Sequence, residues 1–345
     1  MIRTVFDQTQ EPFPTMNTAW SDFIQSRAIA ETTAELDCAL NDLSQFGLIR
    51  VEGEDAEQFL QGQLTNDIRQ VTAEHSNLAG WCSAKGRMLA NFRCFRRGEA
   101  YYLQTPAENL AAVLKRLGMY VLMSKVTLSD ASDDLIRIGL SGACAESLLA
   151  GSFAQIPSTA NDAVEQAELT LIRLPGAQPR FELVAPLEQA IEIWQNAESQ
   201  ASRMGDDFWA LQEIRAGVPT IYPTTSEAFV PQMTNMQLVD GVSFTKGCYI
   251  GQEVVARMQY LGKLKRRMYL AHVASDTLPQ PGDELFSQGS SSGQGTGKVV
   301  DARPANGGFD LLAVIETSSA ETDEVCLGEN GPRLQLQDLP YALPE

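Results

Sequence analysis

The sequence predicts an α+β fold divided into two or three domains, with a small all-β unit at its C-terminal end. Three observations support this. A chain of 345 residues is too long for one ordinary hydrophobic core. Up to about residue 260, segments with strand-like alternation mix with segments of helical periodicity. After Leu261, short alternating runs are separated by Gly, Pro and Ser, which predicts a barrel or sandwich of about 80 residues.

The elements of the first half follow from apolar spacing and from turn residues. Helices are expected at 18–29, from 53–55 to Leu64, and at 105–118, the last with Thr105 as its cap and Pro106 at its first position. Gly118 ends this helix. Strands are expected at 48–51, 76–82, 88–95, 101–104 and 125–128.

The second half again contains both strands and helices before the all-β C-terminal region begins. Strands are expected at 135–140, near Leu171 and at 181–184, and helices at 143–149, 187–196 and from a cap at Asp206 to Ile214. The C-terminal strands are expected at 268–273, 297–300 and 309–315.

Composition excludes several classes of protein. Hydrophobic residues make up 44% of the chain and charged residues 20%, which is ordinary for a globular protein. No apolar run has the length of a membrane span, and the N-terminus lacks the features of a signal peptide. The six cysteines form no C-x-x-C pair and there are two histidines, so we expect neither a zinc site nor a disulfide framework. A reducing cytoplasm fits this pattern.

The net charge of −18 is unevenly distributed. Residues 246–267 hold six Lys or Arg against one acid, while both flanking regions are acidic. A strongly acidic chain repels the phosphate backbone, so we expect no strong direct binding of nucleic acid. The basic segment either holds one anionic ligand or lines a solvated strand edge, where Lys is common.

The segment KGCYIGQE, residues 246–253, contains the candidate reactive group. Apolar residues from Ile250 onward have helical spacing, which places Cys248 just before or at the first turn of a helix. Free amides at a helix start and the nearby Lys246 both stabilise a thiolate. The alternative is that Cys248 is a buried, inert small hydrophobe, which is the usual state of a cysteine.

Several stretches together resemble one family over nearly the whole chain from about residue 40. They are LQGQLTNDI (60–68), CSAKGRMLANFRCF (82–95), SKVTL (124–128), WALQEIRAGVP (209–219), FVPQMTNMQ (229–237), KGCYIGQEVVAR (246–257) and the C-terminal LPYALPE. These resemble the YgfZ family of folate-binding proteins, whose mitochondrial relatives assist the maturation of iron–sulfur proteins. The family shares its fold with the aminomethyltransferase of glycine cleavage.

The resemblance implies an aminomethyltransferase-like folate-binding fold with a C-terminal β-barrel. It divides the chain into a folate-binding domain (1–50 and 130–245), an inserted α+β domain (51–129), and a part that holds the KGCYIGQE segment and the barrel (246–345). It also implies tetrahydrofolate as cofactor, bound in a central cavity, and a functional role for Cys248 and Lys246.

Five residues are implied to contact the folate: Phe46, Asn91, Trp209, Glu213 and Arg215. Trp209 matches a tryptophan associated with folate, and Phe46 offers the flat ring that pterin stacking needs; the alternative for Trp209 is a core anchor of its helix. Asn91 lies where the transferase has its catalytic carboxylate, and an amide cannot act as a general base. Arg215 lies where the transferase has a pterin-holding glutamate, with Glu213 two residues away.

The resemblance leaves three functions open. The first is a folate-binding accessory protein for iron–sulfur enzymes, including those that thiolate tRNA, with those enzymes as partners and Cys248 as its reactive group. The second is a tetrahydrofolate-dependent one-carbon transferase or demethylase, against which Asn91 argues and which a carboxylate elsewhere in the cavity would favour. The third is a non-catalytic folate sensor in which Cys248 is purely structural.

Overall fold

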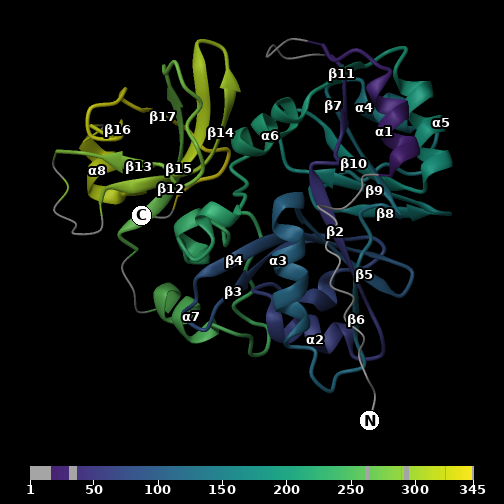
Figure 1. Ribbon diagram of the computed structural model, residues 1–345, viewed down its shortest axis with the longest axis horizontal. Helices are drawn as coiled ribbons and strands as arrows, with labels where there is room; N and C mark the ends of the chain where they lie inside the picture. Colours follow the sequence, from purple (N-terminus) through teal and green to yellow (C-terminus); the bar gives the residue numbers. More distant parts are fainter. Residues whose placement is uncertain are drawn as a thin grey trace.

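The computed structural model describes residues 17–30, 37–260, 264–288, 290, 295–322 and 324–343. In these ranges it contains three β-sheets flanked by helices, which confirms the α+β class. Figure 1 shows two sheets one above the other on the right and the C-terminal sheet on the upper left, with α6 between this sheet and the upper of the two. Most helices and strands expected from the sequence are present, with their ends shifted by a few residues.

The first sheet, which we call sheet A, has six strands and is covered on one face by helices. Trp20, Leu149 and Trp194 bring three helices into one core with the sheet. The covering helices are α1 (Thr18–Gln25), α4 (Ala145–Leu149) and α5 (Leu187–Ala197). In order across the sheet, the strands are β11 (Ser202–Met204), β1 (Ala39–Asp42), β7 (Ile136–Ser141), β10 (Arg180–Ala185), β9 (Leu169–Leu174) and β8 (Ala163–Gln166).

The second sheet, sheet B, has five antiparallel strands and its own helical cover. Leu60 of α2 (Ala56–Gln63) and Leu110 of α3 (Ala107–Gly118) belong to one core with its inner residues, among them Trp81. In order, the strands are β3 (Asn77–Cys82), β4 (Met88–Arg97), β5 (Ala100–Pro106), β2 (Phe46–Glu52) and β6 (Thr127–Asp130).

Sheets A and B pack against each other through a shared core. Leu48 and Phe95 of sheet B and Val184 of sheet A lie in this core together with Trp209 of α6 (Asp206–Arg215). This part of the junction between the two sheets is therefore apolar, and α6 packs against it. The assignment of residues to separate domains stays a prediction.

The C-terminal unit is a six-stranded antiparallel half-barrel, in agreement with the predicted β-structure. Helix α6 contacts its strands β14 and β15. The helix α7 (Gln252–Tyr260) precedes it, and α8 (Thr317–Thr322) lies within it. Its strands in order are β16 (Cys326–Leu327), β13 (Glu284–Phe286), β14 (Gly297–Ala305), β15 (Gly308–Glu316), β12 (Arg266–Val273) and β17 (Gln335–Gln337). The short 3₁₀ turns are η1 (Ile68–Gln70), η2 (Pro223–Thr225) and η3 (Pro231–Thr234).

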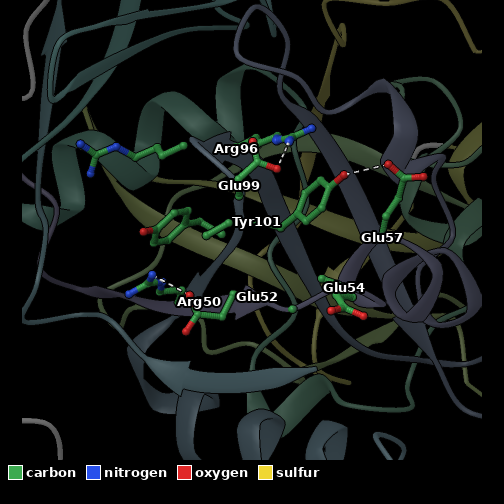
Figure 2. Close-up of a pocket in the computed structure, with 12 residues that line it drawn as sticks. Arg50, Glu52, Glu54, Glu57, Arg96, Glu99 and Tyr101 are labelled. Atoms are coloured by element: carbon green, nitrogen blue, oxygen red, sulfur yellow. Dashed lines mark hydrogen bonds and ion pairs between the residues drawn. The ribbon is translucent and has the colours of Figure 1, made fainter. Parts of the chain in front are cut away.

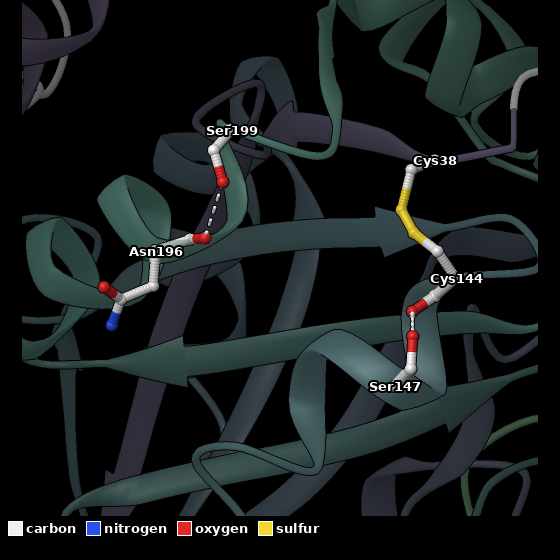
Figure 3. Close-up of a disulfide and its surroundings, with 5 residues drawn as sticks. All are labelled: Cys38, Cys144, Ser147, Asn196 and Ser199. Carbon is white, nitrogen blue, oxygen red and sulfur yellow. Dashed lines mark hydrogen bonds between the residues drawn. A yellow bond between two sulfur atoms is a disulfide. The ribbon is translucent and has the colours of Figure 1, made fainter.

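One disulfide, between Cys38 and Cys144, was not expected from the sequence (Figure 3). The two residues are 106 positions apart, so their spacing gives no signal. The fold brings together the residue before β1 and the residue before α4, with the two Cα atoms 5.6 Å apart. Within the described part of the chain, no helix is both long and apolar enough to cross a membrane.

Candidate functional site

A pocket lies where sheets A and B meet α6, and we call it the inter-sheet pocket. It brings together four of the five residues expected to contact folate, although these residues are far apart in the sequence. Its lining residues are Phe46, Leu78, Asn91, Arg93, Gln104, Thr105, Pro106, Glu182, Trp209, Glu213, Val218, Pro219 and Thr220.

A cluster of buried charges forms one side of this pocket. Arg180, which is 2% exposed, donates from Nη2 to Oε1 of Glu213 over 2.7 Å. Arg93 is also buried and donates to Oδ1 of Asn161 and to Oγ of Ser76. Burial lowers the pKa of Arg93, and the carboxylates of Glu213 and another pocket glutamate oppose this shift. Buried ions of both signs next to a cavity are typical of binding sites and of structural ion networks alike.

Trp209 lines the pocket, but its ring is covered. A Cβ added at Gly139 would lie 2.5–2.9 Å from three atoms of the six-membered ring, so the backbone of β7 packs against the indole. The guanidinium carbon of Arg180 lies 4.6 Å from the ring centroid. With 1% exposure, Trp209 offers no free face to a pterin. Its contacts are those of a core anchor that also supports Arg180.

Phe46 and Asn91 have different positions in the pocket. Phe46 is half-buried at the start of β2 and lines the pocket. The amide of Asn91 is engaged with the backbone, because Nδ2 donates to the carbonyl of Pro219 and Oδ1 accepts from the N–H of Ile221. Asn91 therefore fastens the segment that follows α6 to sheet B.

Glu182 is a pocket residue that the sequence analysis did not identify. It is 1% exposed, and its Oε2 accepts from Nε2 of Gln104 over 3.1 Å. Oε1 of Glu182 and Oε1 of Gln104 have no hydrogen-bond partner. Burial raises the pKa of Glu182, and Arg93 opposes the shift. The signal in the sequence was a lone acid inside the apolar strand RFELVA, since buried polar groups without partners usually have a function.

The pocket is narrow in this conformation. Its volume is about 50 Å³, far below the roughly 300–1,000 Å³ of typical ligand pockets. Its polar groups suit a ligand with hydrogen-bond donors, but a ring system enters only if part of the wall moves.

Arg215 lies outside the inter-sheet pocket. Its Nε and Nη2 donate to Oδ2 of Asp310 over 3.0 and 2.9 Å, on the side of α6 that faces the C-terminal sheet. Glu213 and Arg215 are two residues apart on a helix, so their side chains point in different directions. The structure thus brings Glu213 to the pocket and Arg215 to the half-barrel.

Lys246 is buried, and its ammonium group donates two hydrogen bonds to the backbone. Nζ donates to the carbonyls of Leu64 and Asn66 over 2.7 and 2.8 Å, and it lies 5.2 Å from the ring centroid of Tyr249. Burial lowers its pKa from 10.5 to about 8, with Asp67 opposing the shift. Lys246 therefore joins the KGCYIGQE segment to the loop after α2.

Cys248 is exposed and is not among the residues that line the inter-sheet pocket. The helix begins at Gln252, four residues later, because Gly251 interrupts the chain with a φ of +83°. Helix-start effects are confined to the first turn, so the argument for a helix-stabilised thiolate does not apply at this distance. The exposure of Cys248 is the remaining argument for its reactivity. Of the other free cysteines, Cys82 and Cys94 are buried and Cys326 is half-buried.

A larger groove on the outer end of sheet B has no buried acceptor without a partner, although the donors Nε of Arg50 and Nε of Arg97 lack one. It has a volume of about 570 Å³ and is lined by charges of both signs. Figure 2 shows that these charges pair with each other: Arg50 with Glu52, Arg96 with Glu99, and Tyr101 with Glu57. We therefore regard the inter-sheet pocket as the candidate site. Among the described residues, no three or more His, Cys, Asp or Glu form a group able to hold a metal ion.

Comparison with known proteins gives consistent matches. The model of the GCVT N-terminal domain family matches residues 11–205. A tRNA-modifying protein YgfZ of Yersinia enterocolitica is 33% identical over 91% of this chain and 96% of its own. YgfZ proteins of Escherichia coli and Klebsiella pneumoniae are each 32% identical with the same coverage.

The fold has a solved counterpart. The glycine cleavage system aminomethyltransferase T of Bartonella henselae superposes with a TM-score of 0.65 and 17% identity, covering 89% of this chain and 86% of that one. At this identity the likeness establishes the aminomethyltransferase-like fold alone. The matches in sequence show that the chain belongs to the YgfZ family of tRNA-modifying proteins, and its residues 11–205 match the GCVT N-terminal domain.

Proposed function

We propose that this protein binds a reduced folate in the inter-sheet pocket and acts in the cytoplasm as an accessory protein for iron–sulfur enzymes that modify tRNA. The part concerning tRNA rests on relatives named tRNA-modifying proteins, which align over 91% of the chain. The iron–sulfur part rests on the resemblance of its motifs to the same family. The observation that carries the folate part is the buried, half-unpartnered carboxylate of Glu182.

The chemistry of the pocket suits a pterin. A pterin carries an amino group and a ring N–H side by side, and a carboxylate accepts two such donors at once. Oε1 of Glu182 and Oε1 of Gln104 are the acceptors without partners, and leaving each unpaired costs about 1–3 kcal/mol. Phe46 supplies a ring to stack on, while Arg93 balances the charge of Glu182.

Cys248 would act at a separate place on the molecule. It is exposed, so a client protein has access to its sulfur without entering the folate pocket. A single thiol provides one ligand or one nucleophile, and the described residues offer no metal-binding group around it. The proposed role is therefore a transient contact with an iron–sulfur client and not the storage of a cluster.

Calorimetric titration with 5-formyltetrahydrofolate tests the folate site. Glu182→Gln removes the charge from the hydrogen bonds to the ligand, and such bonds contribute about 1.5–3 kcal/mol. We expect the affinity to fall by roughly 10-fold to 150-fold. Glu188→Gln, an exposed glutamate on α5, is the matched control and should bind like the wild type. Equal affinities of the wild type and Glu182→Gln would contradict the assignment.

A cellular assay tests the role of Cys248. Cells that carry Cys248→Ala should lose tRNA thiolation to the same extent as a deletion strain. Cys326→Ala, at a half-buried cysteine of the half-barrel, is the control and should leave thiolation intact. The accessory role is refuted if Cys248→Ala cells match the wild type under oxidative stress, when damaged clusters are most abundant.

Glu182 also favours the second candidate function, a one-carbon transferase. Asn91 cannot accept a proton, but Glu182 and Glu213 are carboxylates in the same pocket. Burial raises the pKa of Glu182, and a raised carboxyl pKa is typical of groups that act in general acid–base catalysis. Formation of methylenetetrahydrofolate from an aminomethyl donor, abolished in Glu182→Gln, would support this function over the accessory role. We expect none.

A further inference from the structure

The inter-sheet pocket has one irregular wall, residues 218–220, which we call the pocket wall. The other lining residues belong to strands β2, β3, β4, β5 and β10 or to α6. Strands within packed sheets open only at a high free-energy cost, whereas loops open at a low one. Since the pocket holds only about 50 Å³, the pocket wall is the part whose movement would admit a ligand.

Tyr341, near the C-terminal end, holds the beginning of this wall. Its hydroxyl donates to the carbonyl of Gly217 over 2.7 Å and accepts from Nδ2 of Asn235 at 3.4 Å. Gly217 has a φ of +68°, and an added Cβ there would lie 2.6 Å from Cε1 of Tyr341. Only glycine permits both this backbone conformation and the close approach of the ring.

The rest of the C-terminal tail, residues 338–343, strengthens this attachment. Leu339 packs against the core that contains Val218 and Ile221. Burial raises the pKa of Tyr341 to about 12, so its hydroxyl keeps the donated proton at physiological pH. The tail thus runs from strand β17 of the half-barrel back to the segment that closes the pocket.

We propose that the C-terminal tail is a strap that keeps the inter-sheet pocket narrow through the hydrogen bond from Tyr341 to Gly217. Release of this bond lowers the free-energy cost of moving the pocket wall, which the hydrogen bonds of Asn91 with Pro219 and Ile221 also hold, and the ligand binds the open form. Because the tail continues from the half-barrel, the half-barrel thereby influences whether a ligand can enter the pocket. This inference rests on the proposed folate site, because it assumes that the ligand enters this pocket.

The effect of cutting the strap follows from the population of the open form. A neutral hydrogen bond has a net worth that corresponds to a factor of roughly 2 to 12 in an equilibrium constant. Tyr341→Phe removes the bond and keeps the ring, so the open fraction should rise by that factor. When a ligand binds a minor form, its apparent affinity rises in proportion to the fraction of that form. The variant should therefore bind more tightly than the wild type.

Two measurements on the full-length chain test the strap. Hydrogen exchange of the ligand-free protein should become faster in the peptide 214–222 of Tyr341→Phe. Titration with 5-formyltetrahydrofolate should show an affinity roughly 2- to 12-fold higher than that of the wild type. Tyr269→Phe is the control, because Tyr269 lines the groove beside the tail and does not touch Gly217. It should change neither measurement.

The outcomes separate the strap from the folate site. If the wild type fails to bind 5-formyltetrahydrofolate, the folate proposal fails, and the exchange comparison still tests whether the tail holds the wall. If the wild type binds and Tyr341→Phe exchanges at the same rate, the strap is refuted. If Tyr341→Phe exchanges faster but binds the ligand no more tightly than the wild type, the tail holds the wall without controlling ligand access, and that part of the proposal is refuted.

Discussion

Replacing Lys246 by methionine tests whether this residue is an anchor of the KGCYIGQE segment. The substitution keeps most of the length of the side chain and removes both of its hydrogen bonds. The carbonyls of Leu64 and Asn66 then lose their partner in a site where Lys246 itself is 5% exposed. Each buried carbonyl left without a partner lowers the free energy of unfolding by about 1–3 kcal/mol. Part of this loss is offset, because the variant no longer buries an amine.

We expect a net loss of about 2–4 kcal/mol for Lys246→Met. In a domain of 150–250 residues, each kcal/mol lost from the free energy of unfolding lowers the unfolding temperature by about 2–4 °C. The midpoint of thermal unfolding should therefore fall by at least about 4 °C. Lys85→Met is the matched control: Lys85 is an exposed lysine in the turn between β3 and β4, and its loss should shift the midpoint by less than about 2 °C.

The pH dependence adds a second test of the same residue. The pKa of Lys246 in the folded protein, about 8, lies below its usual value of 10.5. Between these two values the unfolded chain binds more protons than the folded one, so stability rises with pH in this window. The difference in midpoint between the wild type and Lys246→Met should therefore widen from pH 8 to pH 10. A Lys246→Met protein as stable as the wild type at every pH would refute the anchoring role.

Three further predictions concern other residues. Site-by-site alkylation should find Cys248 the fastest of the free cysteines, ahead of Cys326, since Cys82 is buried and burial raises its pKa to about 12; equal rates at Cys248 and Cys326 would favour the folate-sensor reading. Trp209→Ala should destabilise the fold by about 3–5 kcal/mol in thermal unfolding, because its ring is covered by protein; a stable variant with lost folate affinity would show that the ring stacks on the ligand. Burial raises the pKa of Asp301 from 3.8 to about 6, so the folded state binds more protons between these values and stability falls as pH rises through them. Thermal unfolding at pH 4.5 and 7 should therefore show that the wild type loses stability relative to Asp301→Asn, and parallel curves would contradict this.

Regular periodicity made most of the fold predictable. Helix α3 and the long strand β4 carry strong apolar patterns and were expected within two residues of their ends. The errors lie at boundaries that distant residues decide. Thr105 was expected to cap α3, but pairing of Phe46 with Pro106 extends β5 to Pro106, and the helix begins one residue later. The short strands β1 and β11 depend on each other for their parallel pairing and have too few residues for a local signal.

The candidate site was predictable in part, through the resemblance to a family. Phe46, Asn91, Trp209 and Glu213 converge on one pocket as expected, whereas Arg215 does not. The covering of Trp209 by Gly139 could not be read from the sequence, because it depends on packing between elements far apart in the chain.

Groups whose role depends on partners in three dimensions were beyond sequence reasoning. The free oxygen of Glu182 is recognisable only when all its neighbours are known. The direction of the Lys246 ammonium, away from solvent and toward two carbonyls, follows from the loop after α2. The hydrogen bond from Tyr341 to Gly217 joins the tail that follows the half-barrel to the segment beside the pocket.

A structure of the protein bound to 5-formyltetrahydrofolate tests the central claim most directly. The account predicts the pterin in the inter-sheet pocket, with its amino edge on Glu182, its ring against Phe46 and the pocket wall displaced from its present position. It also predicts that the sulfur of Cys248 remains outside this pocket. A folate bound elsewhere, or with the pterin in contact with Cys248, would contradict the account.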